Sequence, residues 1–226
     1  MFLFDIWYFI LVIPAILFCV WAQWRVKHSF AKYSQMPTQN GLTGAQAAAD
    51  VLAQAGVTGV TIERIDGELT DHFDPRSNTI RLSAVVYDKA NVAAVGVAAH
   101  EAGHAIQYAE GYGPISVRTA IIPVTNIGSK LAIPLVIAGF LIDITGLIYA
   151  GIILFAAVVV FQLVTLPVEF NASGRAVATL DGYAMLTMDE VEGAKKVLTA
   201  AALTYVGALA VSLMQLIRLI LLARQR

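Results

Sequence analysis

The chain has 226 residues, of which 58% are hydrophobic and only 14% are charged, and its mean hydropathy is +0.71. Such a composition is far more apolar than that of an average soluble domain, and it predicts a membrane protein. A formal net charge of −1 without any block of like charges gives no sign of nucleic-acid binding. The single cysteine, Cys19, excludes a disulfide framework and a cysteine-based zinc site.

The first apolar segment is long enough to cross a bilayer. It extends from Phe2 to Trp24 with Asp5 as its only charged member, and about 20 residues suffice for a helical span. A secretory signal peptide would carry basic residues before its apolar core and a small-residue cleavage site after it. Here the basic residues follow the segment and no such site is present. We therefore predict an uncleaved transmembrane anchor over residues 1–24.

The more polar stretch over residues 25–126 is typical of a compact domain. A run of helix formers over residues 43–56 begins with threonine and ends with glycine, which predicts a helix. Two β-branched runs over residues 60–65 and 79–83 alternate apolar and polar positions, which predicts a small sheet. From Asn91, a good N-cap residue, no strong helix breaker occurs until Gly111, so we predict a second helix there.

This second helix contains the sequence His100-Glu101-Ala102-Gly103-His104. Residues four apart lie one turn above each other, so His100 and His104 can bind one zinc ion. Glu101 lies on the neighbouring side, where it can take a proton from zinc-activated water as a general base. Two histidines and a glutamate are costly to bury in an Ala/Val-rich helix unless they have partners, which a metal supplies. The pattern therefore predicts zinc-dependent peptide hydrolysis.

The later part of the chain contains further candidate spans. Residues 146–168 are almost entirely apolar, and the shorter run over residues 131–142 reaches span length if its helix begins near Ile127. The predicted segments are a transmembrane hairpin over residues 127–168, a segment over residues 169–196 that is too charged to be a span, and a C-terminal membrane helix over residues 197–226.

Three stretches of the chain together resemble one protein family. They are GELTDHFDPRSNTIRLSAVVYDKANVAAVGVAAHEAGHAIQ, LPVEFNASGRA and AALTYVGAL, and the similarity extends over residues 33–214. They are similar to the bacterial membrane-bound neutral zinc metallopeptidases, which are gluzincin-like and distantly related to the heat-shock and CAAX-prenyl membrane metalloproteases. The resemblance implies an α+β, mainly helical multi-pass membrane protein with a small gluzincin-like peptidase domain, and Zn²⁺ as its cofactor.

The resemblance also implies a third zinc ligand, a glutamate downstream of the HExxH helix, and the matching residue is Glu169. Two membrane crossings between His104 and Glu169 would return the chain to the same side. Pro167 is expected to interrupt the returning span, so that a short new helix carries the ligand. Other gluzincins have an aspartate four residues after the glutamate to orient a ligand histidine. Ser173 stands at that position here, and Asn171 stands where closer relatives would have aspartate.

Three further residues are candidates for contacts with a substrate or an oxyanion. His72 could line the cleft, or it could be a structural residue in a turn. Arg175 could stabilise an oxyanion, or it could anchor the chain at the membrane interface. The run over residues 79–83 is either an ordinary strand or an exposed edge strand that binds extended substrate through its main chain. In that strand Ile80 and Leu82 are expected to point inward, with Ile80 as a possible substrate contact.

Two other functions compete with the zinc peptidase. A site-2-type intramembrane protease takes its third ligand from an LDG motif, and Leu180-Asp181-Gly182 is present. However, Asp181 lies in a stretch too charged to be a span. The second is a non-catalytic metal-binding membrane scaffold. A structural zinc site would need a fourth protein ligand, whereas Glu101 would be an adjacent carboxylate that does not bind the metal.

Basic residues predict how the protein is oriented. They flank the predicted spans on one side and are missing from the hairpin turn, which predicts a plasma-membrane protein with a cytoplasmic catalytic domain. With four full crossings, Arg224 and Arg226 would lie outside the cell, which contradicts the rule that basic residues favour the cytoplasmic side. The expected partners are a protein or peptide substrate near the membrane and the lipid bilayer, without nucleic acid. The basic residues in question are Arg25, Lys27, Lys32, Arg118, Lys130, Lys195 and Lys196.

Overall fold

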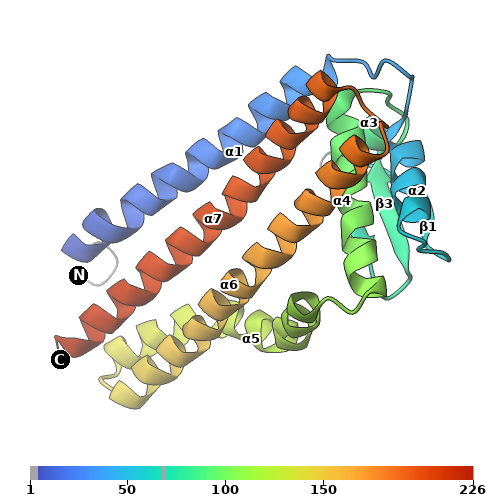
Figure 1. The fold of residues 1–226 in the computed structure, drawn as a ribbon. Helices are drawn as coiled ribbons and strands as arrows, with labels where there is room; N and C mark the ends of the chain where they lie inside the picture. Colours follow the sequence, from blue (N-terminus) through green and yellow to red (C-terminus); the bar gives the residue numbers. More distant parts are fainter. Residues whose placement is uncertain (1–4, 68–69, 226) are drawn as a thin grey trace. The chain divides into compact units, whose positions relative to one another are not determined.

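A computed structural model describes residues 5–67 and 70–225, and it is mostly helical with one small sheet (Figure 1). This confirms the predicted fold class. The described residues form two compact units: unit 1 comprises residues 5–22, 116–166 and 203–225, and unit 2 comprises residues 23–67, 70–115 and 167–202. Phe2 and Arg226, on which two expectations rest, lie outside the described residues.

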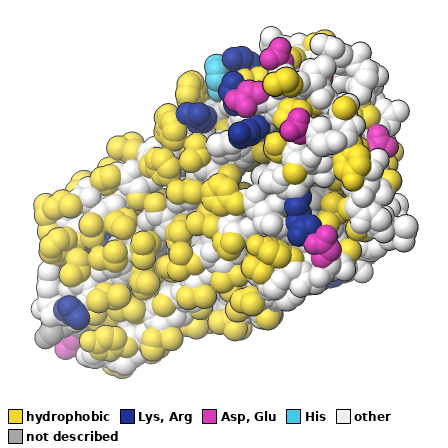
Figure 2. Space-filling model, viewed as in Figure 1, with side chains coloured by type: hydrophobic (Ala, Val, Ile, Leu, Met, Phe, Trp, Pro, Cys, Tyr) yellow, Lys and Arg dark blue, Asp and Glu magenta, His cyan; other side chains and the backbone are white. Residues whose placement is uncertain are grey.

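Unit 1 is built from long apolar helices. A π-helical turn, Tyr8–Val12, leads into α1 (Ile13–Ser34), and the other helices that contribute are α5 (Gly113–Leu141), α6 (Thr145–Gly182) and α7 (Met188–Arg224). All four are long and apolar enough to cross a membrane. Figure 2 shows that hydrophobic side chains cover most of the unit 1 surface in view, whereas charged side chains gather on unit 2. The short apolar run predicted over residues 131–142 falls largely within α5, a candidate span whose helix begins at Gly113.

The predicted break at Pro167 is wrong, because α6 continues through this residue to Gly182. A proline inside a helix removes one backbone hydrogen bond. In an apolar environment, unwinding the helix would leave several backbone groups without partners, which costs more than the loss of one bond. Glu169 is therefore carried by the same helix that forms the third candidate span.

Unit 2 contains the sheet, whose strands are β1 (Thr61–Ile65), β2 (His72–Asp74) and β3 (Thr79–Ser83) in the order β1-β3-β2. β3 pairs with β1 in parallel and with β2 in antiparallel fashion. The two predicted strands are present. Of the two alternatives for residues 79–83, the structure shows an ordinary strand and not an exposed edge strand, since β3 is paired on both sides. The physical reason is that β2, a strand of only three residues in a turn-rich stretch, covers its outer edge.

The helices of unit 2 begin where capping residues predict. α2 (Gly44–Gln54) starts with a capping box between Thr43 and Gln46, and α4 (Val92–Ala109) is capped by Asn91, whose side chain accepts a hydrogen bond from the Ala94 amide. A four-residue helix, α3 (Ala84–Tyr87), separates β3 from α4. The small side chains of α4 are almost all buried in the unit 2 core, so this helix offers fixed positions for functional groups.

Candidate metal centre

The two histidines of α4 and the glutamate of α6 converge within unit 2. The Nε2 atoms of His100 and His104 lie 3.4 and 3.6 Å from Oε2 of Glu169. Ligand atoms of the three residues all lie within 4.8 Å of one another. Glu169 is 2% exposed and His104 is 9% exposed, so the three groups form a cluster largely removed from solvent.

The cluster fits a tetrahedral zinc ion. Ligands that lie about 2.0–2.1 Å from zinc in a tetrahedron are separated from one another by roughly 3.3–3.4 Å. The two imidazole-to-carboxylate distances are close to this separation. Two histidines and one glutamate are also a known ligand set of catalytic zinc sites, which keep a fourth position for water or substrate. The donor set therefore matches zinc in chemistry, and the two histidine–glutamate distances match it in spacing.

A glycine inside the HExxH motif allows α4 and α6 to approach closely. A Cβ atom built on Gly103 would lie 2.7 Å from the carbonyl oxygen of Ala172, and real Cβ contacts do not reach this distance. Ala172 lies three residues after Glu169 on α6. The absence of a side chain at Gly103 therefore brings the carboxylate ligand to the histidines.

Both histidines have a hydrogen-bonding partner at the nitrogen that faces away from the cluster. Nδ1 of His100 lies 3.1 Å from the Ser173 hydroxyl, and Nδ1 of His104 lies 3.0 Å from Oε1 of Gln107. Such outer contacts orient the rings of metal-binding histidines. Ser173 thus takes the position where the resemblance implies an orienting aspartate. Gln107 was missed by sequence reasoning, although a polar side chain one turn after His104 on an apolar helix was an available signal.

The electrostatic environment of the cluster favours a cation. Burial by itself lowers the pKa of His104, but its contact with Glu169 and the negative charges of Glu101 and Glu169 outweigh burial, so that its pKa is raised above the ordinary value. A field that favours a proton on this ring also favours a metal ion between the same groups.

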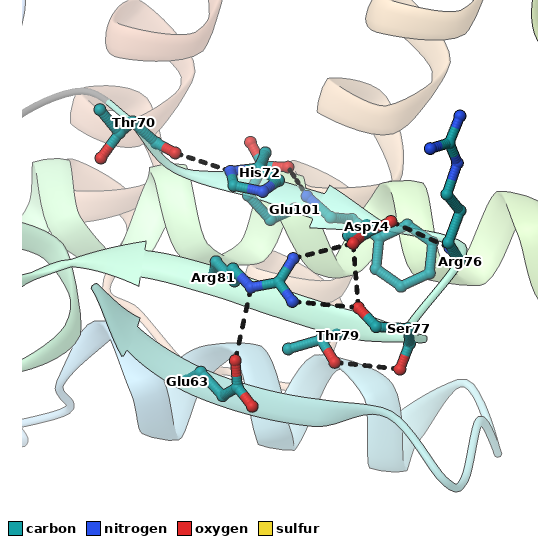
Figure 3. Close-up of polar contacts among 10 residues, drawn as sticks. Glu63, Thr70, His72, Asp74, Arg76, Ser77, Thr79, Arg81 and Glu101 are labelled. Carbon is teal, nitrogen blue, oxygen red and sulfur yellow. Dashed lines mark hydrogen bonds and ion pairs between the residues drawn. The ribbon is translucent and has the colours of Figure 1, made fainter. Parts of the chain in front are cut away.

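Glu101 lies beside the cluster without being part of it. Its Oε2 atom accepts a hydrogen bond of 3.0 Å from the backbone amide of Phe73 on β2, and its side chain can be seen beside this strand in Figure 3. The residue is 8% exposed. Glu101 is therefore a buried carboxylate that the main chain of β2 holds in place.

The remaining predicted site residues lie elsewhere in unit 2. His72 is exposed on β2, and its Nδ1 atom lies 2.8 Å from the Thr70 carbonyl oxygen (Figure 3). Arg175 is engaged by Glu110 at 2.7 Å and by Asn171 at 2.8 Å. The structure therefore connects neither predicted contact residue directly to the histidine–glutamate cluster.

Burial and position also place Ile80 of β3 and Asp181 of the LDG motif. Ile80 is fully buried in the core of unit 2, as is Leu82. This confirms that both side chains point inward. The main chain of Ile80 lies between β1 and β2, which pair with β3 on its two sides, so Ile80 does not lie at an exposed edge where a substrate strand could add. Asp181 is exposed near the end of α6 and is not one of the three residues that converge.

Two comparisons with known proteins agree with this geometry. The profile of a family described as "Putative neutral zinc metallopeptidase" matches residues 8–224. The chain belongs to this family. A protein of Bacillus subtilis (strain 168) named "Putative membrane protease YugP" is 45% identical over 212 residues, which make up 94% of each chain. No solved structure matches the chain significantly. This member of the zinc metallopeptidase family thus combines candidate membrane spans with a histidine–glutamate cluster suited to a metal ion.

Proposed function

We propose that the protein is a zinc-dependent membrane endopeptidase, with His100, His104 and Glu169 as the zinc ligands and Glu101 as the general base. The observation that carries this proposal is the convergence of two imidazoles and one carboxylate at tetrahedral spacing. Membership of a zinc metallopeptidase family supports it independently. A fourth protein ligand, which a purely structural zinc site would need, is not part of the cluster formed by the described residues.

The placement of Glu101 suits proton transfer. A bound zinc ion would act as a Lewis acid that makes water acidic near neutral pH and polarises the scissile carbonyl. The Phe73 amide holds Oε2 of Glu101, and this leaves Oε1 to take a proton from the attacking water. The same carboxyl group can then pass the proton to the leaving amine.

We further propose β2 as the strand that binds substrate, in place of β3. In an antiparallel strand the N–H and C=O of one residue point to the same side. Since the Phe73 amide points to Glu101, the Phe73 main chain faces away from β3. The Phe73 amide is used by Glu101, so an extended peptide at this outer edge would hydrogen-bond the Phe73 carbonyl oxygen, which would bring its backbone next to the general base. Because β2 has only three residues, other contacts would have to set the enzyme's preference for particular substrate sequences.

The substrate proposed here is a protein or peptide near the membrane surface, and the proposed location is the plasma membrane. The basic segments that flank the candidate spans support a cytoplasmic catalytic domain. We also propose that membrane segments end or begin at residues 24, 126, 168 and 196, which separate the anchor, the catalytic domain, the transmembrane hairpin, the segment with the third ligand and the C-terminal helix. Labelling of a cysteine introduced at Ser77, which is exposed, tests the sidedness: an impermeant reagent should not modify it in intact cells.

The decisive experiment compares wild type with Glu101→Gln in purified protein. The amide cannot accept the proton, so casein hydrolysis should fall to background while zinc content stays at one ion per chain. Glu192→Gln, which changes an exposed glutamate of unit 2, controls for the loss of one negative charge and should hydrolyse casein at the wild-type rate.

Two results would contradict the proposal in different ways. Full activity of Glu101→Gln would remove the general base from the mechanism. A wild-type protein that binds zinc tightly but hydrolyses no protein or peptide substrate would favour the metal-binding scaffold.

A further inference from the structure

We infer that Gln107 is a positioning residue that fixes the tautomer of His104, at the end of a hydrogen-bonded chain that starts at Arg175 and passes through Asn171. The inference rests on the proposed function, because it concerns how one ligand presents its nitrogen to the zinc. It assigns a role to three residues that neither bind the metal nor take part in proton transfer.

The chain begins with a group that can only donate. The guanidinium of Arg175 has no acceptor atom, and its Nε donates to Oδ1 of Asn171 at 2.8 Å. Glu110 holds the other end of the guanidinium at 2.7 Å. The Asn171 amide must therefore turn its oxygen, and not its nitrogen, toward Arg175. This removes the usual ambiguity of an asparagine side chain.

The next link is Gln107, which is fully buried on α4. Its Nε2 donates to Oδ1 of Asn171 at 2.9 Å and to the backbone carbonyl of Val168 at 2.8 Å. Both partners are acceptors, so both protons of the amide are used. Since the amide cannot rotate by 180° without bringing its oxygen against these two oxygens, its Oε1 atom has to face His104.

The last link sets the proton on the imidazole. Oε1 of Gln107 carries no proton and lies 3.0 Å from Nδ1 of His104, so Nδ1 must donate. In a neutral imidazole the other nitrogen then presents a lone pair. That nitrogen, Nε2, is the one that faces Glu169 at 3.6 Å. The chain therefore holds His104 in the tautomer that binds a metal through Nε2.

The second histidine is held differently. Nδ1 of His100 contacts the hydroxyl of Ser173, and a hydroxyl can either donate or accept. Ser173 can orient the ring of His100, but it does not determine the ring's tautomer. We therefore expect the preorganisation of the site to depend more on Gln107 than on Ser173.

The chain also connects the two helices that supply the ligands. Gln107 belongs to α4, whereas its two acceptors, Val168 and Asn171, lie on α6 on either side of Glu169 in the sequence. Loss of Gln107 would thus loosen both the ring of His104 and the placement of the carboxylate next to it.

The test measures zinc affinity by chelator competition and the melting temperature of the metal-free protein, for wild type, Gln107→Met and Gln107→Glu. Methionine fills a similar volume but offers the ring no oxygen, so the zinc dissociation constant should rise about 10- to 100-fold. Glutamate offers Nδ1 an acceptor oxygen whether its carboxyl is ionised or protonated, while it fits Val168 and Asn171 poorly. Gln107→Glu should therefore lose thermal stability yet keep a zinc affinity closer to wild type than to Gln107→Met.

A second pair of variants tests the start of the chain. Arg175→Met removes the donor that orients Asn171 and should weaken zinc binding, by less than Gln107→Met does. Glu110→Gln removes an exposed ion-pair partner (53% exposed side chain) but leaves the Arg175–Asn171 contact, so it is the matched control and should bind zinc like wild type.

The possible outcomes separate this inference from the proposed function. A wild-type protein without stoichiometric zinc would overturn both. Wild-type zinc binding together with unchanged affinity in Gln107→Met would overturn the inference alone. Equal losses of affinity in Gln107→Met and Gln107→Glu would show that Gln107 only fills space, and this too would overturn it.

Discussion

Unit 1 and unit 2 each bury charged groups, but they do so in different ways. In unit 1, Arg218 is 4% exposed, and its Nε and NH2 groups lie 2.8 and 2.6 Å from Oδ2 of Asp5. Its guanidinium also lies 5.2 Å from the centre of the Tyr8 ring. One buried cation is thus matched by one carboxylate and one aromatic face.

In unit 2 the carboxylate of Glu169 faces two histidines and not a permanently charged cation. In the neutral tautomer, Nε2 of His104 and Oε2 of Glu169 both present lone pairs, so a proton or a metal ion has to lie between them for the two groups to attract each other strongly. Burial of ionisable groups is therefore not by itself a mark of function. A matched cation and anion indicate structural stabilisation, whereas several lone-pair donors that face one another indicate a metal site.

The largest expected effect comes from removing the carboxylate that completes the unit 2 cluster. Glu169→Ala should lower zinc content well below one ion per chain and abolish hydrolysis, because two histidines alone leave zinc with half of its ligands. Metal analysis of the purified variant, together with a casein assay, measures both effects.

Asp181→Ala is the control for this experiment and also tests the rival enzyme class. Asp181 is exposed and lies outside the cluster, so this variant should keep its zinc. Retention of zinc by Glu169→Ala together with its loss from Asp181→Ala would place the third ligand in the LDG motif of a site-2-type protease.

The next effect concerns the close approach of α4 and α6. Gly103→Ala would place a methyl group 2.7 Å from the Ala172 carbonyl oxygen, so the helices must separate and move Glu169 away from the histidines. A misplacement of about 1 Å can cost roughly 100-fold in rate, and we expect a loss of this size in kcat/KM with weaker zinc binding. Gly174→Ala, where a Cβ would meet nothing within 4 Å, is the control: it should keep activity and gain up to about 1 kcal/mol of stability.

Local sequence signals predicted the parts of the site that lie on one helix. The caps at Thr43 and Asn91 and the spacing of His100, Glu101 and His104 on α4 depend on neighbouring residues, and the structure agrees with each of these expectations about local structure. The inward direction of Ile80 also follows from strand alternation. The candidate spans were likewise visible as runs of apolar residues.

Contacts between distant segments were not visible in the same way. β2 has only three residues and its stretch shows no alternation long enough to indicate a strand, so the sequence left open whether β3 lies at the edge. The continuity of α6 through Pro167 depends on an apolar environment that local propensity does not include. Gln107 acquires its role only from α6 residues about sixty positions away along the chain.

A third expected effect is a loss of stability that leaves zinc binding unchanged, and it concerns the ion pair between Asp5 and Arg218 in unit 1. Asp5→Asn leaves the Arg218 guanidinium without its carboxylate and should destabilise the protein by on the order of 3 kcal/mol. The double variant Asp5→Asn/Arg218→Met should lose much less than the sum of the single changes. Unfolding midpoints in detergent measure both, and zinc content should stay at the wild-type value. Loss of zinc in the single variant would show that the pair supports the metal site as well.

The smallest expected effect comes from a partly exposed ion pair in unit 2, between Asp74 of β2 and Arg81 of β3, which lie 2.9 Å apart (Figure 3). The hydrogen bond from Arg81, together with those from the Arg76 amide and the Ser77 hydroxyl, lowers the pKa of Asp74 from 3.8 to about 2. A lowered pKa means that the folded state favours the ionised carboxylate. The contribution to stability is therefore complete above about pH 4 and disappears as the pH falls through about 2.

Asp74→Asn should flatten the dependence of the melting temperature on pH between about 4 and 2, and it should change little at neutral pH, because solvent still screens a partly exposed pair. Asp50→Asn, at an exposed position of α2, controls for the loss of one negative charge. Scanning fluorimetry at several pH values, with and without added salt, provides the measurement. Since β2 also supplies the amide that holds Glu101, a variant that lost activity at neutral pH would show that this ion pair helps to place β2, and that a partly exposed contact can matter to catalysis as well as a buried one.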